Sequence, residues 1–151
     1  MIKQTLDQDL KAALLAKDTQ AVMVIRSLKS AILYAEVAAK KRDGDGLSDD
    51  EIIGVLQKEA KKRQESADAF LAGGRKEQAE GELSEKVIIE RYLPAQLSEV
   101  EVTQLVKQAI EELQASDIKA MGQVIGAVKQ KAGTAADGAM VAKITREQLG
   151  Q

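Results

Sequence analysis

A complete helix start occurs within residues 92–113, which read YLPAQLSEVEVTQLVKQAIEEL. Pro94, the only proline of the chain, cannot continue a preceding helix, because it has no backbone N–H and restricts the residue before it. Ser98 and Glu101 then have the spacing of a capping box, in which each side chain accepts a hydrogen bond from the other residue's backbone N–H. Apolar residues follow at helical spacing, namely Val102, Leu105, Val106, Ala109, Ile110 and Leu113. The pattern predicts a sharp joint between two helices.

Helical periodicity continues on both sides of this joint. Upstream, apolar residues three and four positions apart predict four helices whose inward faces carry Leu6, Leu10, Ala13 and Leu14; Val22, Ile25, Leu28, Ile32, Ala35 and Ala39; Ile52, Val55, Leu56, Ala60, Ala67 and Phe70; and Ala79, Leu83 and Val87. Downstream, two more helices are expected to bury Met121, Val124, Ile125 and Val128, and Val141, Ile144 and Leu149. No segment shows the alternation of a strand. We therefore predict an all-α protein, with an N-terminal bundle-like part of residues 1–96 and a C-terminal three-helix part of residues 97–151.

Short polar and glycine signals bound the predicted helices. The expected N-terminal caps are Asp18, Ser48 with Glu51, Asp117 and Asp137. The expected helix ends are Gly73-Gly74 and Gly133, since glycine adopts the left-handed conformation without strain. The acidic run Asp43-Gly44-Asp45-Gly46 does not match the spacing of a calcium-binding EF-hand loop, so it is interpreted as a turn.

Composition removes several classes of enzyme. The 151 residues include 44% hydrophobic and 30% charged residues, which is typical of a folded chain, and the net charge is −2. There is no Cys and no His, which excludes disulfides, thiol nucleophiles, Ser-His-Asp triads and His-ligated metals. We predict no catalytic residue, no metal and no cofactor. Residues 1–15 lack the pattern of a signal peptide and no segment is apolar enough to span a membrane, so a cytoplasmic protein without a membrane partner is expected.

A local excess of positive charge lies near the C-terminus. Residues 117–146 hold five basic residues against two acidic ones, a net charge of +3. The basic residues are Lys119, Lys129, Lys131, Lys143 and Arg146. These cations either form a nucleic-acid-binding surface or are solvated and complement the helix dipoles. Two upstream basic clusters, residues 40–42 and 58–63, are interpreted as solvated helix faces.

Two glycines four residues apart, Gly122 and Gly126, share one face of a predicted helix. Glycine inside a helix costs about 1 kcal/mol relative to alanine, so a pair on one face suggests a close neighbour. The neighbour is either another helix of the protein or the backbone of a nucleic acid, which could approach a strip without side chains.

Other polar and aromatic residues are assigned structural roles. Glu82 and Glu85 could suggest acid–base chemistry, but Lys86 and Arg91 are near enough in sequence to pair with them, so a solvated helix is the preferred interpretation. The aromatic residues are only Tyr34, Phe70 and Tyr92, so a platform for base stacking is not expected. Any RNA contact should therefore be to backbone and shape.

The ordered series of landmarks resembles the GatB/YqeY family. It comprises residues 62–66 (KRQES) running to Phe70, Gly74-Arg75 with Glu82 and Glu85, residues 92–97 (YLPAQL), Met121-Gly122 with Gly126, and Gly133 followed by Asp137-Gly138 and Val141. The match covers nearly the whole chain. The chain therefore resembles a free-standing YqeY-type protein. The resemblance implies an all-helical fold whose C-terminal part is similar to the tail of the B subunit of glutamine-dependent tRNA amidotransferase, which is associated with tRNA recognition.

The resemblance implies no catalytic residue. It does imply a tRNA-facing surface that includes Gly122, Gly126, Gly133, Asp137 and Gly138. Together with the five cations, these positions form the predicted RNA-binding set. The expected function is a tRNA-binding accessory protein related to the amidotransferase that forms Gln-tRNA and Asn-tRNA. The alternative is an interaction module that docks an aminoacyl-tRNA synthetase or an amidotransferase subunit. A third possibility is a carbon–nitrogen ligase-associated activity with glutamine as amido donor.

Overall fold

A computed structural model describes residues 1–41 and 44–150 of the chain. The turn predicted at Asp43 falls partly outside these residues. The described residues form helices and contain no strand, which confirms the all-α prediction. The chain divides into two compact units, Met1–Leu93 and Pro94–Gln151, each of which is described by itself. The second unit thus begins at Pro94, whereas the sequence analysis placed its start at residue 97.

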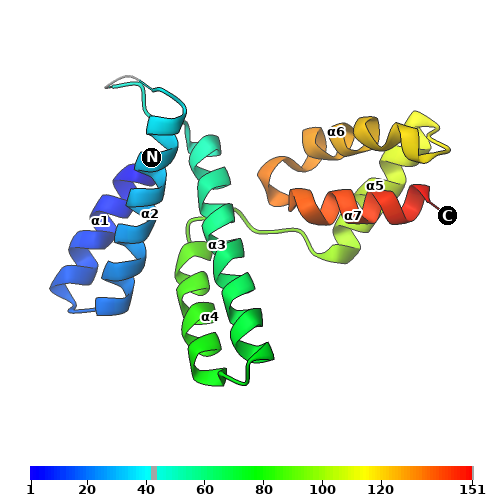
Figure 1. Ribbon diagram of the computed structural model, residues 1–151. Coiled ribbons are helices and arrows are strands. Elements are labelled where there is room, and N and C mark those ends of the chain that lie inside the picture. Colours follow the sequence, from blue (N-terminus) through cyan, green and yellow to red (C-terminus); the bar gives the residue numbers. More distant parts are fainter. Residues whose placement is uncertain (42–43, 151) are drawn as a thin grey trace. The chain divides into compact units, whose positions relative to one another are not determined.

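The first unit contains four α-helices, which form two hairpins (Figure 1). Helix α1 (Ile2–Leu15) packs against α2 (Thr19–Ala38), and α3 (Asp49–Ala72) packs against α4 (Lys76–Glu90). Helix α2 also contacts α3 and α4, so one core joins both hairpins. Its largest fully buried side chains are Leu6, Val24, Leu28, Ile32, Ile52, Leu56 and Ile89.

Side-chain caps fix where two of these helices begin. Asp18 accepts a hydrogen bond from the Ala21 N–H at 3.0 Å and caps α2. Ser48 and Glu51 form the predicted capping box at the start of α3, because each side chain accepts a bond from the other's backbone N–H. Between α3 and α4 the chain turns at Gly74, whose φ of +74° lies in the left-handed region that glycine adopts most easily.

The capping box makes the stability of α3 depend on pH. The backbone N–H of Ser48 holds the pKa of the Glu51 carboxyl below its ordinary value of 4.5. A lowered folded-state pKa means that this contact stabilises fully above about pH 5 and is lost as the pH falls through the folded pKa. Glu51→Gln keeps a capping acceptor without a titratable group. We expect thermal unfolding of this variant to depend less steeply on pH below 5 than that of the wild type; parallel pH profiles would contradict this.

The inward face of helix α4 agrees with the prediction only in part. Ala79 is buried as predicted, whereas Val87 is 54% exposed although the apolar spacing placed it in the core. Ile88 and Ile89, which the pattern did not indicate, are buried. The face toward α3 also includes the polar residues Glu82 and Glu85. Leu14 in α1 is likewise 49% exposed, against prediction.

Arg63 of α3 is the reason that carboxylates are tolerated on this face. Its Nε lies 2.8 Å from Glu85 Oε2 and 4.0 Å from Glu82 Oε2, and its Nη1 lies 3.5 Å from Glu59 Oε2. The prediction that Lys86 and Arg91 pair with Glu82 and Glu85 is wrong. Lys86 instead pairs with Glu90 at 3.3 Å and donates to the Gln64 side chain.

The second unit is a three-helix arrangement with short 3₁₀ segments (Figure 1). Its elements are α5 (Glu99–Leu113), η1 (Ile118–Ala120), α6 (Met121–Ala132), η2 (Gly133–Ala135) and α7 (Gly138–Leu149). The three α-helices contact one another and bury Val102, Val106, Ala109, Val124, Val128, Val141, Ile144 and Leu149. The predicted capping box of Ser98 and Glu101 is present at the start of α5. The Leu97 N–H donates to the Ala135 carbonyl at 2.8 Å, which places the connection from Pro94 with this unit.

Candidate nucleic-acid interface

All ten residues predicted to bind RNA lie in the second unit and are exposed. Lys119 is in η1, and Gly122, Gly126, Lys129 and Lys131 are in α6. Gly133 ends α6, and Asp137, Gly138, Lys143 and Arg146 belong to the start and outer face of α7. Their shared exposure is a necessary condition for an interface, although it does not by itself identify one.

The two glycines of α6 face open space. Gly122, Gly126 and Lys129 are separated by four and three residues, so they form a row along one side of the helix. This row points away from the core, which α6 contacts through Val124 and Val128. A Cβ added at Gly122 or Gly126 would meet no atom within 4 Å. Within residues 94–150, neither α5 nor α7 packs against the two glycines, so packing inside the second unit does not explain the pair.

Two other predicted residues have structural roles that explain them without a ligand. Asp137 caps α7, because its side chain accepts a hydrogen bond from the Ala139 N–H at 3.2 Å. Gly133 has φ +55° and ψ −133°, a conformation that only glycine adopts readily, and it ends α6 as predicted. These two residues shape the α6–α7 connection whether or not RNA binds there.

The predicted RNA-binding cations of this unit differ in whether a carboxylate already pairs with them. Lys131 Nζ lies 3.1 Å from both carboxylate oxygens of Glu112 on α5. Within residues 1–41 and 44–150, Lys119, Lys129, Lys143 and Arg146 form no ion pair. The positive charge left for a ligand on α6 and α7 is therefore smaller than the five cations of the sequence suggest.

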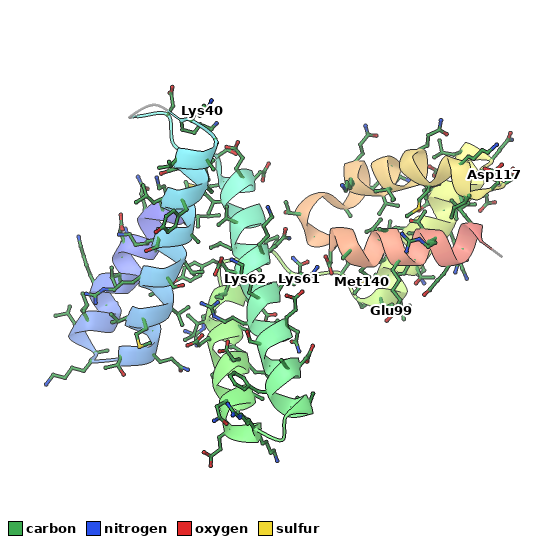
Figure 2. All side chains as sticks on the ribbon, in the orientation of Figure 1. Lys40, Lys61, Lys62, Glu99, Asp117 and Met140 are labelled. Atoms are coloured by element: carbon green, nitrogen blue, oxygen red, sulfur yellow. The ribbon has the colours of Figure 1, made fainter. Side chains whose placement is uncertain are left out.

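Negative charge in this unit is concentrated on α5. Its first turn carries Glu99 and Glu101, and Glu111 and Glu112 lie in its last turn. Figure 2 labels Glu99 at one end of α5 and Asp117 beyond the other end. An anionic ligand should therefore contact the outer faces of α6 and α7 rather than α5.

The first unit holds cavities that the sequence patterns did not reveal. One, of about 330 Å³, lies between α1 and α2 and is crossed by the ion pairs Lys3–Glu36 and Lys29–Asp7. The hydrogen bond from Lys3 holds the pKa of the Glu36 carboxyl below its ordinary value.

A second cavity, of about 400 Å³, lies between α2 and α3 and is lined by Tyr34, Lys58 and Lys62 among others. Tyr34 is 77% exposed, whereas Tyr92 packs against the core and its hydroxyl donates to Asp9 Oδ2 at 2.5 Å. Burial raises the pKa of the Tyr92 hydroxyl, and the bond to Asp9 adds to the effect. No local sequence signal could have brought Tyr34 and the lysines together, because they belong to different helices.

Neither a membrane-spanning helix nor a metal-binding cluster occurs among the described residues. None of the helices in the described part of the chain is long and apolar enough to cross a membrane. Residues 1–41 and 44–150 also contain no group of three or more acidic side chains that could hold a metal ion.

Comparison with known proteins identifies relatives of the whole chain. The family model described as Yqey-like protein matches residues 3–149. Altered inheritance of mitochondria protein 41, mitochondrial, of Saccharomyces cerevisiae is 35% identical over 108 residues, which cover 70% of this chain and 56% of the relative. The protein of the same name in Pyrenophora tritici-repentis is 29% identical over 151 residues, covering 96% of this chain and 79% of the relative. The chain spans little more than half the length of the yeast relative.

The names of these relatives overturn one prediction. Both relatives are named as mitochondrial proteins, so the expectation of a cytoplasmic location is contradicted. The predicted location was inferred from the lack of a signal-peptide pattern and of a membrane-spanning segment, and that inference was wrong. The fold and the ordered sequence landmarks agree with the family match, which extends over both units. The chain therefore belongs to the family of Yqey-like proteins.

Proposed function

We propose that this protein binds tRNA through the outer faces of α6 and α7, as an accessory to tRNA-dependent amidotransferase chemistry. The observation that carries the proposal is the open glycine row of α6, beside which Lys129 has no carboxylate partner among the described residues. Glycine there weakens the helix, and no packing within residues 94–150 offsets this loss. A sugar–phosphate backbone that lies against the row would supply the missing neighbour.

The chemistry of the proposed contact is simple. Without side chains at Gly122 and Gly126, a phosphodiester strand can approach the helix surface more closely than elsewhere on α6. Lys119 and Lys129 would then lie beside the strand, and Lys143 and Arg146 would contribute from α7. Such contacts neutralise phosphates and carry no base sequence information, so recognition would depend on backbone and shape.

The salt dependence of tRNA binding tests the role of these cations. Lys129→Gln and Lys143→Gln should each lower the slope of log K against log salt by about 1, because each removes one phosphate contact. Lys131→Gln is the matched control, since it makes the same change on the same helix at a lysine that Glu112 already holds. Binding measured by filter retention at several salt concentrations should separate the control from the other two. Equal slopes in all three variants would contradict the proposed interface.

The alternative function has one observation in its favour. Leu33 and Val37 on α2 are 60% and 68% exposed, and their spacing of four residues places them on one side of the helix. An apolar face of this kind suits docking of a synthetase or amidotransferase subunit. Association with such a purified subunit that survives nuclease and high salt, and is lost in Leu33→Glu, would support this alternative.

A further inference from the structure

The cavity between α2 and α3 combines an exposed aromatic ring with cations. Tyr34, Ser27 and Ser30 of α2 lie on one side of it, and Lys58, Glu59 and Lys62 of α3 lie on the other. Its volume of about 400 Å³ is within the range of small-ligand sites. Lys61 and Lys62 are both exposed, and Figure 2 labels them on opposite sides of α3. The cavity lies entirely within the first unit.

We propose that this cavity binds one unpaired nucleotide of an RNA strand, with the base stacked on Tyr34 and the phosphate held by Lys58. The inference rests on the proposed function, because it takes RNA to be the ligand. It adds a second point of contact, on the first unit, and a stacking interaction that the count of aromatic residues did not predict.

The aromatic side of the cavity suits a base. Tyr34 is 77% exposed and contributes nothing to the core of the first unit. Bases of every kind offer a flat π-face, so stacking on an exposed ring binds single-stranded RNA with little sequence preference. Duplex RNA has no base free to stack, so the site should select unpaired segments.

The polar side of the cavity suits a phosphate. Lys58 makes no ion pair among the described residues, and the Lys62 side chain is 66% exposed although its Nζ lies 2.9 Å from Glu59 Oε1. Lys62 and Arg63 contact the Glu59 carboxylate, which leaves Lys58 as the cation of this side for a phosphate. Ser27 Oγ accepts from Arg63 Nη2 at 3.3 Å, so its hydroxyl proton remains able to donate to a ligand.

Paired substitutions at Tyr34 separate stacking from simple apolar contact. The probe is a fluorescein-labelled single-stranded RNA of mixed sequence, titrated with the full chain at low salt and followed by anisotropy. Tyr34→Phe keeps the ring and should bind within about twofold of the wild type, whereas Tyr34→Leu should bind about 5- to 150-fold more weakly. Lys58→Gln should weaken binding and lower the salt slope by about 1. Tyr34 is exposed, so all three variants should fold, as circular dichroism can verify.

The outcomes also distinguish this inference from the proposed function. If Tyr34→Leu binds as tightly as Tyr34→Phe, or both lose affinity equally, stacking on Tyr34 is contradicted. If Tyr34→Leu does not change the affinity for the single-stranded RNA while Lys129→Gln weakens tRNA binding, this inference fails and the proposed function stands. If Tyr34→Leu weakens binding of the single-stranded RNA while Lys129→Gln leaves tRNA binding unchanged, the nucleotide site stands and the interface on α6 is contradicted.

Discussion

Replacing Arg63 with methionine should lower the free energy of unfolding of the first unit by about 3 kcal/mol, the scale for breaking a largely buried charge pair. The Arg63 side chain is 17% exposed and lies between Glu59, Glu82 and Glu85. Methionine keeps much of the volume but leaves three carboxylates without their shared cation. Their mutual repulsion should then separate α3 from α4. The measurement is urea denaturation followed by circular dichroism.

Lys62 is the matched control that isolates the effect of burying the ion pairs of Arg63. Lys62 also contacts Glu59, at 2.9 Å, but its side chain is 66% exposed. Solvent screens such a pair, so Lys62→Met should change the stability by less than about 1 kcal/mol. Adding Glu85→Gln to Arg63→Met should recover part of the loss, because it removes one of the unpaired charges. If Arg63→Met costs no more than Lys62→Met, Arg63 does not hold α3 and α4 together.

Alanine at both glycines of α6 should make the second unit more stable. Gly126 lies inside the helix, where alanine gains about 1 kcal/mol, and Gly122 lies in its first turn, where the gain is smaller. Neither new methyl group would meet an atom within 4 Å, so no clash offsets the gain. We therefore expect the double variant to raise the free energy of unfolding by between about 1 and 2 kcal/mol.

A glycine in the other unit serves as the control for this gain. Gly81 lies within α4, and a Cβ there would also meet nothing within 4 Å. Gly81→Ala should stabilise the first unit by about 1 kcal/mol and leave the proposed interface intact. A loss of stability in the double variant would show that Gly122 and Gly126 serve packing after all.

Helix boundaries could be predicted because caps are local. Asp18, Ser48 and Ser98 bond to backbone N–H groups three residues along the chain, so their role is visible in a short window of sequence. The same holds for Gly133 at the end of α6. Periodicity within each helix also indicated most of the core, including Leu28.

Contacts between helices could not be predicted in the same way. Arg63 and Glu85 are 22 residues apart, and their pairing decides which face of α4 points inward. Without that pairing, Val87 looks as suitable for the core as Ile88, because both sit in an apolar run. Lys131 and Glu112 are 19 residues apart, so the loss of one cation from the candidate interface was equally invisible.

The glycine row shows the other limit of sequence reasoning. The spacing of Gly122 and Gly126 predicted a close neighbour but left its identity open. The structure places the row on the outside of α6, where no atom of the second unit approaches it. Packing against α5 or α7 therefore does not account for the two glycines, and an external ligand is our proposal.

The tRNA affinity of the Gly122→Ala, Gly126→Ala double variant tests the central proposal most directly. The full chain and the variant should be titrated with tRNA at low salt, with Gly81→Ala alongside. If a phosphodiester strand lies against α6, two added methyl groups will hold it away, and the more stable variant should bind at least about tenfold more weakly, a change of about 1.4 kcal/mol. Wild-type affinity in the stabilised variant would contradict the proposed interface.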